Sequence, residues 1–164
     1  MLAASKLALM IATVTATIVS GPASAGAQGG ASDVVTRVPI NTGTFAKFMK
    51  ASSNFASYMK QHPADAENIG DSSYDNSEAA AKAICGPRPG VQKAVESAGL
   101  TCSQWVGITV ELSKAGSAAA MVKAGEKVPA ELGVPSADIA FYNAHTADIM
   151  LALQEIGAAS GSSD

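Results

Sequence analysis

The apolar residues of this sequence recur with the period of an α-helix wherever they form a clear pattern. Across residues 45–61 an apolar side chain returns every three or four positions, and lysine and asparagine side chains occupy the opposite face. The apolar arc consists of Phe45, Phe48, Met49, Ser52, Phe55, Ala56 and Met59. No segment of similar length alternates with the two-residue period of a β-strand, so the sequence predicts an all-α fold.

Two short helices are expected in the middle of the chain. Asp75 and Glu78 form a capping-box pattern that would begin the first of them, which would continue to Ile84. Pro89 suits the first turn of the second short helix, because its missing N–H needs no partner there, and Gly99 would end that helix.

Two longer helices are expected after the short ones. Thr101 and Gln104 form a second capping box, which would begin a helix with an apolar face about six turns long. That face consists of Trp105, Ile108, Leu112, Ala115, Ala119 and Val122. Ser136 is expected to cap the final helix, which the pattern predicts to be continuous through residue 156. Its apolar arc contains Ile139, Tyr142, Thr146, Ile149, Met150, Leu153 and Ile156.

The chain contains two cysteines, Cys85 and Cys102. In an oxidising compartment such a pair usually forms a disulfide, and a loop of this length would stabilise the fold by about 3 kcal/mol. Two free, buried thiols are the alternative, whereas a redox role would need a Cys-x-x-Cys spacing that is absent. Three long and two short helices with this cross-link predict an antiparallel helical bundle. It would form one domain over residues 45–157, between a flexible arm over 26–44 and a disordered tail over 158–164.

The first 25 residues have the pattern of a secretory signal peptide. Lys6 precedes an apolar stretch over residues 7–19, and the small residues Ala23 and Ala25 form a cleavage pattern. We therefore expect cleavage near Ala25 and a periplasmic or extracellular location. The apolar stretch is shorter than the roughly 20 residues that span a bilayer as a helix, and no later segment approaches that length.

The charge balance bears on the class of partner. The chain has 11 Lys and Arg residues against 14 Asp and Glu residues, a net charge of −3. Nucleic acid and anionic membrane surfaces are bound by clusters of basic residues, so neither is expected as a partner. The motifs of nucleophilic, metal-dependent and nucleotide-dependent enzymes are absent, and we expect a protein that is not an enzyme.

Four polar residues on or beside apolar arcs are candidates for a binding site. Ser52, Tyr142 and Thr146 would face the small residues of the Trp105 helix, an arrangement that suits an apolar ligand with one polar end. His145 would lie at the edge of the apolar arc, within one turn of Phe141 and Asp148, either as a ligand contact or as a boundary residue. The alternative for the hydroxyl groups is a hydrogen bond to the backbone one turn earlier.

A haem site is a second hypothesis. His145 with Met49 or Met59 has an arrangement similar to that of the small b-type bundle cytochromes, which hold haem between a first-helix methionine and a last-helix histidine. Methionine on an apolar arc is more often part of the core. No other metal site is expected, because the acidic loop departs from the EF-hand pattern at Lys82, where a glutamate is needed.

The sequence therefore predicts a small secreted or periplasmic helical protein that acts by binding, without catalysis. Its partner would be another protein or a small apolar ligand, and haem carriage or electron transfer is the alternative.

Overall fold

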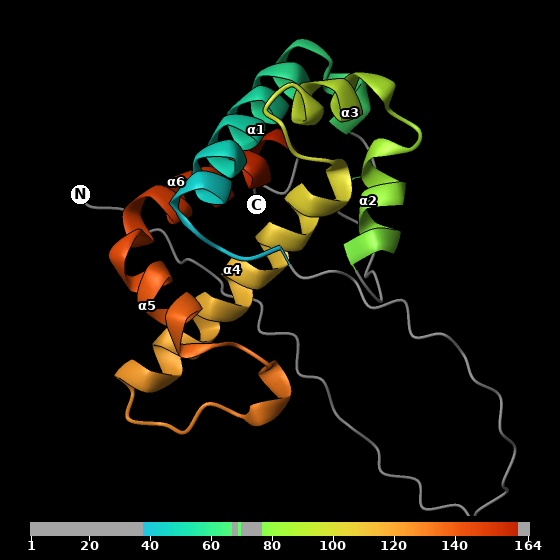
Figure 1. The fold of residues 1–164 in the computed structure, drawn as a ribbon. Helices are drawn as coiled ribbons and strands as arrows, with labels where there is room; N and C mark the ends of the chain where they lie inside the picture. The colour runs from blue at the N-terminus through green and yellow to red at the C-terminus, as the bar shows by residue number, and fades with distance from the viewer. Residues whose placement is uncertain (1–37, 67–68, 70–76, 161–164) are drawn as a thin grey trace, which may run out of the picture. The chain divides into compact units, whose positions relative to one another are not determined.

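The computed structural model describes residues 38–66, 69 and 77–160, all of which belong to one compact unit. Every regular element among them is helical, which confirms the all-α class (Figure 1). The elements are α1 (Thr42–Gln61), the 3-10 turn η1 (Pro63–Ala66), α2 (Ser77–Cys85), α3 (Pro89–Glu96), α4 (Cys102–Lys123), the 3-10 turn η2 (Ala130–Leu132), α5 (Ser136–Ala144) and α6 (Thr146–Ala159). The expected signal peptide, most of the expected arm, the Asp75 cap and the last four residues lie outside the described residues.

Helix α1 begins three residues earlier than expected, at Thr42. The Asn41 side chain accepts hydrogen bonds from the backbone N–H groups of Gly43 and Thr44, at 2.9 and 3.0 Å. The Thr44 hydroxyl in turn accepts from the Asn41 N–H at 3.0 Å, which completes a capping box. Thr44 takes the place of the glutamate that usually completes a capping box. Residues 42–44, which the sequence pattern assigned to the flexible arm, are therefore helical.

The start of α4 is as expected. The Thr101 hydroxyl accepts from the Gln104 N–H at 3.2 Å, and the Gln104 side chain accepts from the Thr101 N–H at 2.9 Å. The apolar face is buried from Trp105 to Ala119. Val122, expected on the same face, is 53 % exposed, and residues 123–127 are exposed as well, because the core ends one turn before it.

Cys85 and Cys102 form the expected disulfide, with their Cα atoms 6.6 Å apart. It joins the last residue of α2 to the first residue of α4, and both cysteines are buried. Helix α2 packs against α4, and α3 packs against α1. Helix α3 runs antiparallel to α1, because Asn54 bonds to Ser97 whereas Tyr58, further along α1, lies against Gly90. Asn54 fixes this second pairing, because its side-chain amide donates to the carbonyl of Ala94 and the hydroxyl of Ser97.

The final helix is not continuous, contrary to the prediction. It is interrupted at His145, whose backbone (φ −120°, ψ 19°) ends α5 and precedes α6. The Thr146 hydroxyl donates to the Tyr142 carbonyl at 2.8 Å and so satisfies an acceptor at the interruption. Ser136 is the first helical residue and does not act as the cap, since Pro135 holds that position in extended conformation.

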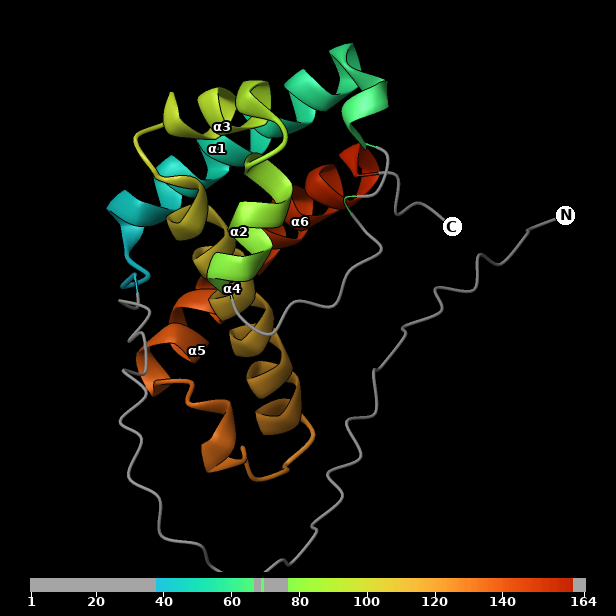
Figure 2. The same cartoon turned by 90° about the vertical axis from the view of Figure 1, so that its right-hand side faces the viewer.

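The interruption changes how the last segment packs. Helix α5 packs on α4, whereas α6 packs on α1 (Figure 2). The rings of Phe45 and His145 lie 5.2 Å apart at the beginnings of α1 and α6, and the ends of the two helices line a common groove. Helices α1 and α6 therefore run parallel, where an antiparallel pairing was expected.

Candidate functional site

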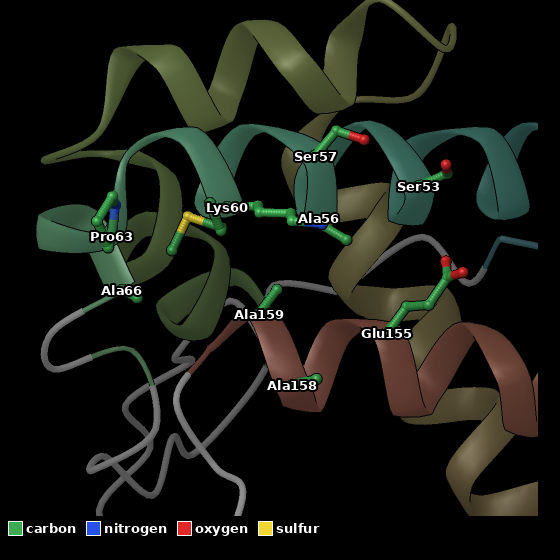
Figure 3. Close-up of a pocket in the computed structure, with 10 residues that line it drawn as sticks. Ser53, Ala56, Ser57, Lys60, Pro63, Ala66, Glu155, Ala158 and Ala159 are labelled. Atoms are coloured by element: carbon green, nitrogen blue, oxygen red, sulfur yellow. The ribbon is translucent and has the colours of Figure 1, made fainter.

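A groove of about 510 Å³ lies between the C-terminal parts of α1 and α6 (Figure 3). Its volume falls within the range of roughly 300–1,000 Å³ that is typical of small-molecule sites. The residues that line it are Ser53, Ala56, Ser57, Met59, Lys60, Pro63, Ala66, Glu155, Ala158 and Ala159. Small side chains dominate this lining, so the two helices leave an open space between them.

The groove follows from the position of these residues on their helices. On α1 the lining residues lie beside the buried face, and Met59 belongs to both, since it is 2 % exposed. On α6 the side chains of Ile149 and Ala152 are buried against the core, and Glu155 and Ala159 follow at the edge of that face. Beyond α1, the turn η1 contributes Pro63 and Ala66 to one end of the groove.

Opposite charges lie on the two walls. Lys60 is on α1 and is exposed, whereas Glu155 is on α6 and is partly buried. The ion pairs found among the described residues involve neither of them. The carboxylate of Glu155 points towards the α1 wall, and the side chain of Lys60 runs along that wall towards Ala56 (Figure 3).

A polar cluster on the other side of α1 holds η1 in place. The Tyr58 hydroxyl donates to the Asp65 carboxylate at 2.7 Å. This hydrogen bond is the main cause that raises the pKa of Tyr58, and burial and the negative charge of Asp65 raise it further. Arg88 donates from Nε to the Asp65 carbonyl at 2.7 Å and from Nη1 to the carbonyls of Ala83 and Ile84 at the end of α2. The cluster thereby connects η1, which carries groove residues, to α2 and the disulfide.

Ser52, a predicted ligand contact, lies in the core. It is 1 % exposed, and its hydroxyl accepts a hydrogen bond from the indole N–H of Trp105 at 3.1 Å. Its neighbour Ser53 lines the groove, about 100° further round the helix. The structure therefore explains the polarity of Ser52 by a bond inside the protein.

Tyr142 and Thr146, two other predicted contacts, lie together where α5 meets α6. The Thr146 hydroxyl is bonded to the Tyr142 carbonyl, as the alternative interpretation had it, and the Tyr142 hydroxyl lies 3.7 Å from the sulfur of Met150. The Tyr142 ring packs closely against Gly116. Because Trp105 and Gly116 are about three turns apart on α4, Tyr142 and Ser52 do not converge on one pocket.

His145 is a boundary residue, with a side chain that is 33 % exposed. Its ring stacks on Phe141 at 4.3 Å and contacts Phe45, and its Nδ1 atom lies 3.9 Å from the Asp148 carboxylate. The aromatic contacts join α5 to the start of α1 at the interruption between α5 and α6. His145 does not line the groove.

The structure separates His145 from one of the two methionines of the haem hypothesis. His145 lies beside Phe45, and Met59 is 14 residues further along α1, a rise of roughly 21 Å. The side chains of His145 and Met59 therefore cannot bind the same iron atom. Met49, one turn after Phe45, is partly buried at the correct end of α1, and its pairing with His145 stays a prediction.

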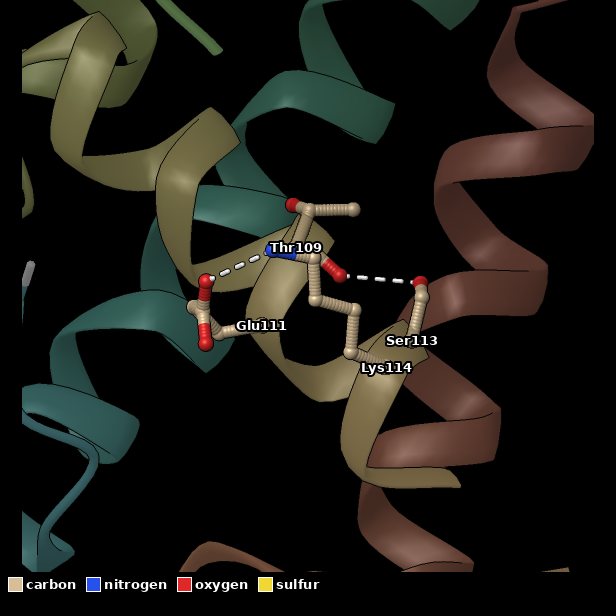
Figure 4. A network of polar contacts seen from close by, with 4 residues as sticks. All are labelled: Thr109, Glu111, Ser113 and Lys114. Carbon is tan, nitrogen blue, oxygen red and sulfur yellow. Dashed lines mark hydrogen bonds and ion pairs between the residues drawn. The ribbon is translucent and has the colours of Figure 1, made fainter. Parts of the chain in front are cut away.

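Several polar residues of α4 bond to other groups of the same helix (Figure 4). The hydroxyls of Thr109, Ser113 and Ser117 each donate to the carbonyl four residues earlier, at 2.9–3.1 Å. Lys114 lies 3.3 Å from Glu111 on the same helix. These bonds are internal to α4, so they define no site.

Sequence reasoning missed the groove, including Lys60 and Glu155.

No helix within the described ranges is long and apolar enough to cross a membrane. No group of three or more His, Cys, Asp or Glu residues suited to a metal ion occurs in this part of the chain either. No protein-family model, curated protein or solved structure matches the chain.

Proposed function

We propose that this protein binds a small, largely apolar ligand in the groove between α1 and α6, without catalysing a reaction. The observation that carries the proposal is the groove itself, with its volume of about 510 Å³. Alanine, proline and methionine side chains provide its apolar surface, and Lys60, Glu155 and the serines provide a few polar groups. Sites for small molecules have this combination of a mostly apolar lining and few polar contacts.

The position of η1 supports the proposal. Pro63 and Ala66 line one end of the groove, and the bonds of Tyr58 and Arg88 to Asp65 hold that turn in a fixed position. A lining that is ordered before binding lowers the entropy lost when a ligand binds.

We also propose that the chain is exported to the periplasm or the outside of the cell. The support is the signal-peptide pattern of residues 1–25 together with the Cys85–Cys102 disulfide, a bond typical of oxidising compartments. N-terminal sequencing of the protein recovered from the secreted or periplasmic fraction should begin at Gly26. An intact Met1 on that protein would contradict export by cleavage.

The groove is tested by filling it. Ala158 is exposed and lines the groove, so Ala158→Trp should block the site with little effect on folding. The matched control is Ala120→Trp, which places the same side chain at an exposed position on α4. We expect 1-octanol to raise the melting temperature of the wild type and of the control, and to leave that of Ala158→Trp unchanged.

Two outcomes would contradict the proposed site. One is an equal thermal shift in Ala158→Trp and in the control, which would place binding elsewhere. The other is the absence of any shift with 1-octanol, and with fatty acids and aromatic small molecules, in the wild type. A native mass spectrum and an absorption spectrum of the protein from its own compartment would then show whether it carries a different ligand, including haem.

A further inference from the structure

The two charged side chains of the groove lie on opposite walls and do not pair with each other. Lys60 belongs to α1 and Glu155 to α6, and neither takes part in an ion pair among the described residues. Two other charged side chains do have partners, since Lys114 lies 3.3 Å from Glu111 and Arg88 donates to the carbonyls at the end of α2. As far as the described part of the chain shows, the groove therefore presents one cation and one anion without ion-pair partners.

The parallel pairing of α1 and α6 sets the positions of these charges along the groove. Phe45, in the first turn of α1, lies close to the level of His145, which directly precedes α6, because their rings are in contact. Glu155 is ten residues beyond His145 and so lies level with Phe55, which places Lys60 five residues, or roughly 7–8 Å, further along the common axis. The two residues are thus staggered along the groove, and the side chain of Lys60 runs from its position back towards Ala56 (Figure 3).

This arrangement discriminates between ligands by charge. A ligand with a carboxylate alone would be attracted by Lys60 and repelled by Glu155, and a ligand with an ammonium group alone would meet the reverse. Across a partly exposed groove the two effects are similar in size, so they largely cancel. A ligand that carries both groups gains from both walls.

We infer that the ligand is a zwitterion, with an ammonium group and a carboxylate separated by a short apolar chain, an inference that rests on the proposed function. The carboxylate accepts hydrogen bonds from Nζ of Lys60, and the ammonium group donates to the carboxylate of Glu155. The chain between them lies on Ala56, Met59 and Ala159. Ser53 and Ser57 complete the polar part of the lining on α1.

Four probes with the same eight-carbon chain test the inference: 8-aminooctanoic acid, octanoic acid, octylamine and 1-octanol. Dissociation constants are measured by titration calorimetry on the full-length protein at neutral pH and low salt. We expect 8-aminooctanoic acid to bind up to about fivefold more tightly than either singly charged probe, since each exposed charge pair contributes up to that factor. Added salt should reduce this preference, because both contacts are exposed to solvent.

Charge substitutions identify the contacts. Lys60→Met should remove the advantage of 8-aminooctanoic acid over octylamine, and Glu155→Gln should remove its advantage over octanoic acid. The double variant Lys60→Glu/Glu155→Lys should restore zwitterion binding with the ligand reversed, which a merely structural role of the two residues would not produce. Lys123→Met, at an exposed position on α4, is the control and should leave all four constants unchanged.

The outcomes separate the inference from the proposed function. If 1-octanol binds in the groove as tightly as 8-aminooctanoic acid, the groove is a ligand site but the inference is wrong. A singly charged probe that binds most tightly overturns the inference in the same way. If none of the four probes binds, both the inference and the proposed groove site are overturned.

Discussion

Helix α1 has two sides that differ in how completely their polar groups are used. On the side that faces α3 and α4, the indole N–H of Trp105 is bonded to Ser52 and the hydroxyl of Tyr58 to Asp65. On the side that faces α6, Lys60 lines an open groove without an ion-pair partner among the described residues. Satisfied polar groups stabilise a fold, whereas unpaired groups around a space are available to a ligand. The comparison separates the residues that hold this protein together from those proposed to bind.

The largest expected effect comes from the buried side. Phe48 is fully buried, so Phe48→Ala should lower the free energy of unfolding by about 3–5 kcal/mol through lost burial and a cavity. Leu151, one turn before Glu155 on α6, is 53 % exposed, and Leu151→Ala should change it by no more than about 0.5 kcal/mol. Urea denaturation measures both. Similar losses in the two variants would contradict the exposure of Leu151.

The disulfide comes next. Replacing Cys85 and Cys102 together by serine should lower the free energy of unfolding by about 3 kcal/mol, because the unfolded chain gains conformational freedom. Ligand affinity in the groove should be unchanged, since the cross-link joins α2 to α4 and the groove lies between α1 and α6. Calorimetric titration with 1-octanol checks this, and a loss of binding in a variant that stays folded would mean that the two sides are coupled.

The buried hydrogen bond of Ser52 should have an intermediate effect. Ser52→Ala leaves the indole N–H of Trp105 without an acceptor inside the core, at a cost of about 1–3 kcal/mol. Ser53→Ala, at the next residue on the groove side, should be nearly neutral for stability. Denaturation followed by Trp105 fluorescence measures both variants. An equally small effect of Ser52→Ala would show that the indole finds another acceptor.

Ser52 and Ser53 also show how much of the structure could be predicted from the sequence. Helical period identified the buried face of α1. The capping box at Thr101 and the first-turn proline Pro89 located the beginnings of α4 and α3, because such signals are local. Ser52 was correctly assigned to that face, but its acceptor role depends on Trp105, which is 53 residues away and on another helix. Its role as a core acceptor was therefore not predictable from spacing.

The groove was not predictable for a related reason. The interruption at His145 involves neither proline nor glycine, and its aromatic contacts are with Phe141 and with Phe45 on a distant helix. The interruption allows α6 to run parallel to α1, and this pairing brings Glu155 and Lys60 to the same space. In the sequence both residues are ordinary charged positions on polar helix faces.

The hydrogen bond between Tyr58 and Asp65 should make the free energy of unfolding depend on pH. Its hydrogen bond to Asp65, then burial, then the charge of Asp65 raise its pKa above the ordinary value of 10.0. A raised pKa in the folded state means that the bond contributes stability below the unfolded pKa and that this contribution is lost as the pH rises through the folded pKa. Tyr58→Phe should therefore be less stable than the wild type at neutral pH, and the difference should shrink above about pH 10.

Denaturation midpoints of both proteins measured from neutral to alkaline pH test this dependence. Asp65→Asn should reduce it, because the substitution removes the charge that opposes ionisation of Tyr58. A difference between Tyr58→Phe and the wild type that stays constant across this range would contradict the role assigned to the bond.

The smallest expected effect lies in the groove, and it is the sharpest test of the comparison. Lys60→Met and Glu155→Gln should each change the free energy of unfolding by no more than about 0.5 kcal/mol, as for other exposed charges. Because the two groups do not pair, the double variant should equal the sum of the single ones in the ligand-free protein. With 8-aminooctanoic acid bound, the same cycle should show a coupling energy, since one ligand then contacts both walls. Coupling above about 1 kcal/mol without ligand would mean that Lys60 and Glu155 already stabilise each other, and this side of α1 would then resemble the Tyr58 side.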